Sequence, residues 1–183
     1  MNKKLIFGLF FVMIFLQLIV PFSMIIKRED ALRQGMEFRF KTAPVDPYDA
    51  FRGRYVALRL EAEKVNKPDK LNLKFGQKIY ASISVDENGF AYFSQLSTRR
   101  PHRGSYIDAK VDHFLANDVY LVLPIDRYYM EEKSAPKAER IYRQRNRENK
   151  VDTYVTVKVK DGFVVVDGLY IGRERIEEFI KGK

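Results

Sequence analysis

The chain has 183 residues, with 33 Lys and Arg against 24 Asp and Glu, and its formal net charge at pH 7 is +9. It contains no cysteine, which excludes disulfides, thiolate catalysis and metal sites with Cys ligands. A basic chain of this length has room for one folded domain with a real core, and its charge favours acidic partners.

The first distinctive segment is the uncharged run of residues 5–26, LIFGLFFVMIFLQLIVPFSMII. As a helix it reaches roughly 33 Å, enough to cross a hydrocarbon core of about 30 Å. Gln17, Pro21 and Ser23 are its clearly non-apolar members, and a membrane helix tolerates all three. The chain is therefore predicted to divide into a short tail, a transmembrane anchor, a juxtamembrane segment and a domain, at residues 1–4, 5–26, 27–35 and 36–183.

The alternative to a permanent anchor is a cleaved signal peptide, with Lys3 and Lys4 as its basic start. Such signals have an apolar core of about 7–15 residues followed by small residues at the cleavage site. The run here is longer and ends in PFSMII, without a small pair at that spacing. We expect an uncleaved single-pass anchor in the cell membrane. Because a short N-terminal tail normally stays inside, we expect the domain on the extracytoplasmic side.

The domain is predicted to be mostly β-structure, because polar and apolar residues alternate along several short segments. The expected strands are residues 37–41, 55–65, 78–86, 89–96, 106–111, 119–123, 154–160 and 163–166. The dipeptides Asn88-Gly89 and Asp161-Gly162 predict tight hairpin turns.

Two helices are expected in the domain. Residues 134–149 form the clearer one, with Ser134 as its N-cap and Pro136 in its first turn. Residues 173–181 are predicted to be a short terminal helix. The fold class is therefore α+β and β-rich, with one mainly antiparallel β domain after the transmembrane helix.

The most distinctive motif spans residues 44–60, PVDPYDAFRGRYVALRL. A structural interpretation is adequate, since Asp46 can bond to backbone N–H groups in an Asx-turn and Gly53 can take a positive φ. The alternative is a binding loop that presents Arg52 and Arg54 to an anionic partner.

This segment resembles the signature of the GDYXXLXY family, a bacterial family of membrane-anchored proteins with no established activity. Gly53, Tyr55 and Leu58 match the signature. Arg54 stands where the family has Asp, and Leu60 stands where it has Tyr.

A second likeness to that family lies at residues 127–132, RYYMEE, where an aromatic pair and Glu lead into a helix. The resemblance implies an extracytoplasmic accessory role, often encoded beside a predicted multi-pass membrane protein. It implies no known reaction.

Catalytic and metal-binding patterns are weak. Ser134 and Lys137 match S-x-x-K, but the S-D-N and K-T-G partners of that serine–lysine chemistry are missing. His102 lies in a basic run, and neither it nor His113 has a second histidine at ligand spacing. We expect no metal, no cofactor and no enzymatic activity.

Basic residues gather in two places. The residues concerned are Arg99, Arg100 and Arg103 in one cluster, and Arg140, Arg143, Arg145 and Arg147 in the other. One interpretation is a solvated surface, and the other is contact with anionic lipid headgroups, an anionic envelope polymer or an acidic partner. No nucleic-acid-binding signature accompanies them.

The leading hypothesis from sequence is a non-enzymatic, membrane-anchored accessory or interaction module that acts with an integral membrane protein. The alternatives are a binding module for anionic lipid or envelope polymer and a Ser–Lys hydrolase.

Overall fold

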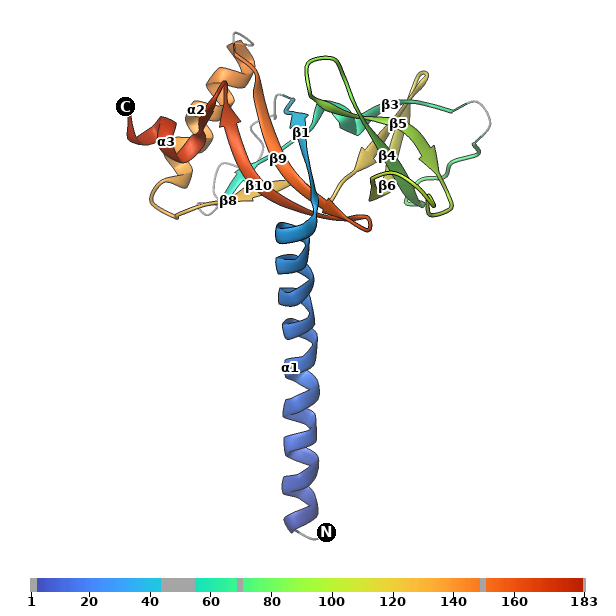
Figure 1. Ribbon diagram of the computed structural model, residues 1–183, viewed down its shortest axis with the longest axis vertical. Coiled ribbons are helices and arrows are strands. Elements are labelled where there is room, and N and C mark those ends of the chain that lie inside the picture. The colour runs from blue at the N-terminus through green and yellow to red at the C-terminus, as the bar shows by residue number, and fades with distance from the viewer. Residues whose placement is uncertain (1–2, 44–54, 69–70, 149–150, 183) are drawn as a thin grey trace.

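A computed structural model describes residues 3–43, 55–68, 71–148 and 151–182 of the chain. It begins with the helix α1 (Lys3–Gln34), which is continuous through Pro21 and stands out from a β-rich domain (Figure 1). Within the described residues α1 is the one helix long and apolar enough to cross a membrane, and its most apolar stretch is not buried in the protein. The predicted anchor and juxtamembrane segment thus form one helix.

The strands of the described chain form three antiparallel sheets. Their orders are β1-β9-β10-β11, β2-β8 and β3-β7-β6-β4-β5. The bounds are β1 Met36–Lys41, β2 Tyr55–Ala57, β3 Lys64–Asn66, β4 Lys78–Val85, β5 Ala91–Ser97, β6 Tyr106–Leu115, β7 Asp118–Val122, β8 Arg127–Tyr129, β9 Thr153–Lys160, β10 Phe163–Ile171 and β11 Glu174–Arg175. A short 3-10 helix, η1 (Glu61–Glu63), and the helices α2 (Ala135–Glu148) and α3 (Ile176–Lys181) complete the domain. The α+β, β-rich fold class is confirmed.

Both predicted hairpin turns are present. In the β4–β5 turn the Asp86 carboxylate accepts hydrogen bonds from the backbone N–H groups of Asn88 and Phe90, at 2.9 and 2.8 Å. In the β9–β10 turn Asp161 and Gly162 both have positive φ, at 51° and 82°. Positive φ at both central residues is the geometry of a type I′ turn, which matches the twist of the flanking strands.

The prediction of one strand over residues 55–65 is wrong. The alternation itself is real, because Val56, Leu58 and Leu60 are all buried. However, the carboxylate of Glu63 accepts a hydrogen bond from the N–H of Leu60 at 3.0 Å, and this closes the single turn η1. The predicted strand is therefore divided: its first residues form β2, which pairs with β8, and its last residues belong to β3 in the five-stranded sheet.

The remaining differences concern the ends of several elements and one additional strand. The strands β6 and β10 extend past their predicted ends at residues 111 and 166. The terminal helix is shorter than predicted, because β11 pairs with β10 before α3 begins. The helix α2 begins one residue after Ser134, whose hydroxyl donates to the Glu131 carboxylate at 3.3 Å. The strand β8 was not among the predicted strands.

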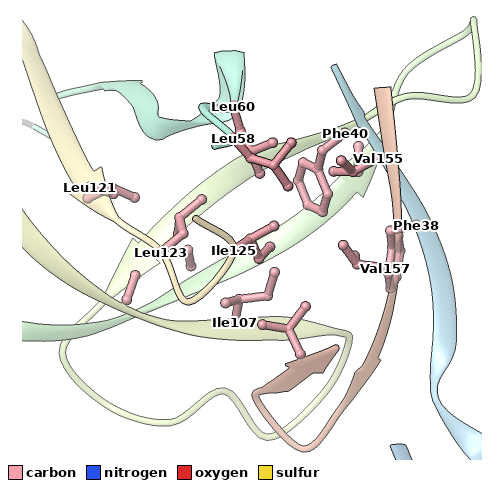
Figure 2. Packing of buried hydrophobic residues seen from close by; sticks show 14 of the residues in the cluster. Phe38, Phe40, Leu58, Leu60, Ile107, Leu121, Leu123, Ile125, Val155 and Val157 are labelled. Atoms are coloured by element: carbon pink, nitrogen blue, oxygen red, sulfur yellow. The ribbon is translucent and has the colours of Figure 1, made fainter. Parts of the chain in front are cut away.

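One apolar core lies between the four-stranded and five-stranded sheets (Figure 2). Phe38 and Phe40 enter it from β1, and Ile107 enters it from β6. The rings of Phe40 and Phe93 lie 5.5 Å apart and join the edge strand β1 to the opposite sheet. This shared core makes the β domain one unit, on which α1 is mounted.

Candidate functional site

The two segments that resemble the family lie side by side, although about 70 residues separate them. They form the sheet β2–β8, which we call the motif ladder, with Tyr55 opposite Tyr129, Val56 opposite Tyr128 and Ala57 opposite Arg127. Leu58 extends the pairing, since its N–H donates to the carbonyl of Asp126 at 2.9 Å. Asp46, Arg52, Gly53 and Arg54 lie outside the described residues.

The two faces of the motif ladder differ. Val56 and Tyr128 are buried and belong to the core. On the other face the rings of Tyr55 and Tyr129 meet edge to face, with their centroids 5.7 Å apart, and the Arg127 guanidinium lies 5.0 Å from the Tyr55 ring. Tyr129 is 64% exposed, so this face offers an aromatic and cationic surface to solvent.

The buried face of the ladder is tied to the C-terminal elements. The hydroxyl of Tyr128 donates to the carboxylate of Glu177, and Glu177 also forms an ion pair with Arg175 at 3.4 Å. Burial, followed by the hydrogen bond to Glu177, raises the pKa of Tyr128 to about 12. The phenol is therefore neutral at physiological pH, and its role here is to hold the ladder against β11 and α3.

A second notable region is the junction between α1 and the domain. The ammonium group of Lys160, at the end of β9, lies 2.7 Å from both carboxylate oxygens of Asp30 and 2.8 Å from the side-chain oxygen of Gln34. Ala31 is 1% exposed, and the N–H of Gly35 donates to its carbonyl at 2.9 Å. The last turns of α1 are therefore packed against β9 and β10 rather than joined to them by a linker.

Beside this junction lies an open cavity of about 470 Å³. Its cationic residues come from three elements: Lys27 from α1, Lys78 from β4 and Lys110 from β6. Ile79, Val122, Leu123, Pro124, Phe163 and Val164 contribute apolar surface to it. Lys27 is the first charged residue after the apolar run, and its ammonium group lies 4.5 Å from the centroid of the Phe163 ring. We call this the junction cavity.

The two predicted arginine clusters lie at different ends of the domain. Arg100 forms an ion pair with Asp161 at 3.1 Å, and Asp161 directly follows Lys160, so this cluster lies beside α1. The second cluster is placed by Asn146, which lies between Arg145 and Arg147 in α2. Asn146 accepts a hydrogen bond from the hydroxyl of Thr153, the first residue of β9, at 2.9 Å, so this part of α2 lies at the opposite end of β9 from Lys160.

The distance between those two ends follows from β9, whose eight residues span about 25 Å at roughly 3.3 Å per residue. Figure 1 shows the C-terminal end of α2 on the side of the domain away from α1. Within that cluster Arg143 pairs with Glu139 at 2.6 Å and Arg145 with Glu148 at 3.5 Å. Arg140 and Arg147 are exposed and have no ion pair within the described residues.

Ser134 and Lys137 have separate partners. The ammonium group of Lys137 donates to the carbonyl of Ile180 at 2.8 Å, and the hydroxyl of Ser134 donates to Glu131. The described residues contain no group of three or more His, Asp or Glu side chains placed to hold a metal ion. His113 stacks on the Tyr120 ring at 4.4 Å, with Nδ1 2.8 Å from the Asp112 carboxylate.

Sequence reasoning missed the junction cavity, because its lysines are isolated in the sequence and only the fold brings them together. The family likeness singled out both segments of the motif ladder, but it predicted neither that the second is a strand nor that the two segments pair.

Comparison with known proteins identifies a family, but no individual protein that is similar to the chain. A family model described as GDYXXLXY protein matches residues 17–169. No curated protein and no solved structure is significantly similar to the chain. The matched residues include the motif ladder, the junction between α1 and the domain, and most of the β-structure. The chain belongs to the GDYXXLXY family.

Proposed function

We propose that this protein is a non-enzymatic accessory module, anchored in the cell membrane by α1, with its domain on the extracytoplasmic side and an integral membrane protein as its partner. The observation that carries the proposal is the junction of α1 with the domain. A helix held by Asp30, Ala31 and Gln34 fixes the direction of the domain relative to the membrane. Such a mounting suits a subunit that must present one face to a neighbour in the same bilayer.

The anchor has polar groups at Gln17 that are available to a neighbouring helix. Pro21 has no N–H to donate to the carbonyl of Gln17, and within the described residues the Gln17 side chain makes no hydrogen bond. By contrast, the hydroxyl of Ser23 already donates to the carbonyl of Val20 in the same helix, at 2.7 Å. Polar side chains join neighbouring membrane helices at about 0.6–2 kcal/mol each, so Gln17 is the better candidate contact.

The test is purification of the full-length protein from its native membrane in mild detergent, followed by identification of co-migrating proteins. The proposal predicts one integral membrane protein at comparable abundance. Replacing residues 5–26 by an unrelated apolar helix of equal length, with residues 27–34 retained, is expected to remove that partner. Gln17→Leu is expected to weaken the complex about threefold or more, and Ser23→Ala is the matched control with a smaller effect.

A lone, monodisperse protein in these purifications would contradict the proposal. A partner that is retained when the anchor is replaced would place the interface on the domain instead. In that case the exposed face of the motif ladder, with Tyr129 and Arg127, is the surface to substitute next.

A second candidate function is binding of an anionic envelope polymer by α2. Arg140 and Arg147 support it, because both are exposed and neither has an ion pair within the described residues. Arg147 also follows Asn146, which contacts the end of β9 away from α1. Arg140→Gln/Arg147→Gln is expected to abolish salt-sensitive polymer binding. Binding that is indifferent to salt and to these changes would contradict it.

A further inference from the structure

We propose that the junction cavity is a binding site for the phosphate-bearing headgroup of an anionic membrane lipid, held by Lys27, Lys78 and Lys110. This site is distinct from the partner surface proposed above, and its failure or success leaves that proposal standing.

Lys78 and Lys110 are direct partners across the antiparallel strands β4 and β6. Directly opposed residues in such a pair project from the same face of the sheet, with their Cβ atoms about 5 Å apart. Like charges in this position are destabilising. Neither lysine has an ion pair or a hydrogen-bonded side-chain partner among the described residues. An anion bound between the two ammonium groups would attract both of them and so offset their mutual repulsion.

The third lysine reaches the same cavity from a different element. Lys27 lies on α1 and covers one face of the Phe163 ring. Three cations from a helix and two strands thus surround a volume of about 470 Å³, within the usual range for ligand pockets of roughly 300–1,000 Å³.

The acidic residues of the cavity do not cancel this charge. Asp161 is already paired with Arg100 at 3.1 Å. Asp108 lies two residues from Lys110 along β6, on the same face, and offsets one of the three lysines. The cavity therefore keeps an excess of positive charge, which suits a single phosphodiester.

The position of the cavity identifies the source of that phosphodiester. With residues 5–26 in the hydrocarbon core, Lys27 lies at the level of the headgroups. The apolar part of the lining, with Val122 52% exposed and Phe163 half-buried, lies beside the same helix. A lipid can place its phosphate among the lysines and its glycerol and upper acyl region against these side chains. A soluble phosphate compound would leave the apolar lining uncovered.

The experiment uses full-length protein in mild detergent and native mass spectrometry of bound lipid, with phosphatidylglycerol compared with phosphatidylcholine. Wild type is expected to retain phosphatidylglycerol preferentially. Lys78→Gln/Lys110→Gln should weaken its binding at least about tenfold, since each suitably placed lysine contributes about a fivefold gain near an anionic surface. Arg140→Gln/Arg147→Gln removes the same charge from α2, which contributes no residue to the lining of the cavity, and is expected to leave binding unchanged.

Several results would overturn the proposal. These are equal retention of the two lipids, equal loss in both double variants, and displacement of the lipid by millimolar glycerol phosphate. The folding control is thermal unfolding in phosphatidylcholine nanodiscs, where Lys78→Gln/Lys110→Gln should unfold at the same or a higher temperature than wild type. A clearly lower temperature would mean that the lysine pair stabilises the sheet by itself, which also contradicts the argument.

Discussion

The ammonium group of Lys160 lies 2.7 Å from each carboxylate oxygen of Asp30, across 130 residues of sequence. The pair joins the last turns of the apolar helix to the hairpin β9–β10. Both side chains are about one-third exposed, so the free energy it contributes is modest, about 1 kcal/mol or less. The main effect of the pair is on orientation, because it fixes the angle at which α1 leaves the domain.

The first prediction concerns that angle. Asp30→Asn is expected to lower the free energy of unfolding by less than about 1 kcal/mol but to broaden the range of angles between α1 and the domain. The measurement is the electron–electron distance distribution between spin labels at Met24→Cys and Lys181→Cys, two exposed positions in a chain without native cysteine.

The charge-reversed variant Asp30→Lys/Lys160→Asp is the control for this prediction, and it should narrow the distribution again. An Asp30→Asn distribution as narrow as that of wild type would show that the other contacts, among them the Lys160–Gln34 hydrogen bond and the packing of Ala31, hold the junction without the ion pair.

The second prediction concerns Gly35, where α1 passes into β1. A Cβ at this position would lie 2.3 Å from the carbonyl oxygen of Ala31 and 3.1 Å from the backbone N of Val159, and backbone atoms cannot move aside cheaply. Gly35→Ala is expected to destabilise the domain by about 2 kcal/mol or more, measured by chemical denaturation.

Gly182→Ala is the matched control, because the nearest atom to its Cβ is 3.8 Å away and its φ is −80°. This variant should unfold like wild type. A tolerated Gly35→Ala would mean that the junction is looser than its packing indicates.

The third prediction concerns Tyr142 in α2, which is fully buried and accepts a hydrogen bond from Asn146 at 3.3 Å. Burial raises the pKa of its phenol to about 12. Between pH 10 and 12 the unfolded chain loses this proton while the folded chain keeps it. Stability therefore falls as pH rises through this window.

Tyr142→Phe removes that titration. At pH 7 the variant should be less stable than wild type by about 1 kcal/mol, because the hydroxyl's hydrogen bonds are lost. The difference should shrink by about 1 kcal/mol between pH 9 and 11, as measured by urea unfolding at each pH. A difference that stays constant with pH would contradict the raised pKa.

The fourth prediction concerns the side of the membrane. Lys4→Cys and Lys181→Cys place single thiols at exposed positions at the two ends of a chain that has no other cysteine. A membrane-impermeant maleimide added to intact cells should label Lys181→Cys, and it should label Lys4→Cys only after lysis. The reverse pattern would place the domain in the cytoplasm.

The sequence predicted those parts of the fold that depend on local chemistry. Asp161-Gly162 specifies its own turn, because both residues can adopt positive φ. The long apolar run likewise specifies a helix without help from tertiary contacts. Where the chain changes partners, local patterns were insufficient: residues 55–65 alternate throughout, yet η1 divides them between two sheets.

The candidate sites depend on long-range pairing and were harder to predict. Nothing around Lys78 or Lys110 marks either residue, since their opposition is created by the register of β4 on β6. The pairing of Tyr55 with Tyr129 is similarly a property of the sheet. The family likeness identified both segments but carried no information on their contact.

The proposed contact between α1 and an integral membrane protein lies within the bilayer. Its most direct test is photo-crosslinking in native membranes, with a photoreactive residue at Gln17 and, as the comparison, at Phe7. We expect a strong crosslink from Gln17 to one integral membrane protein, reproducible between preparations. Crosslinks from both positions to lipid alone would contradict it.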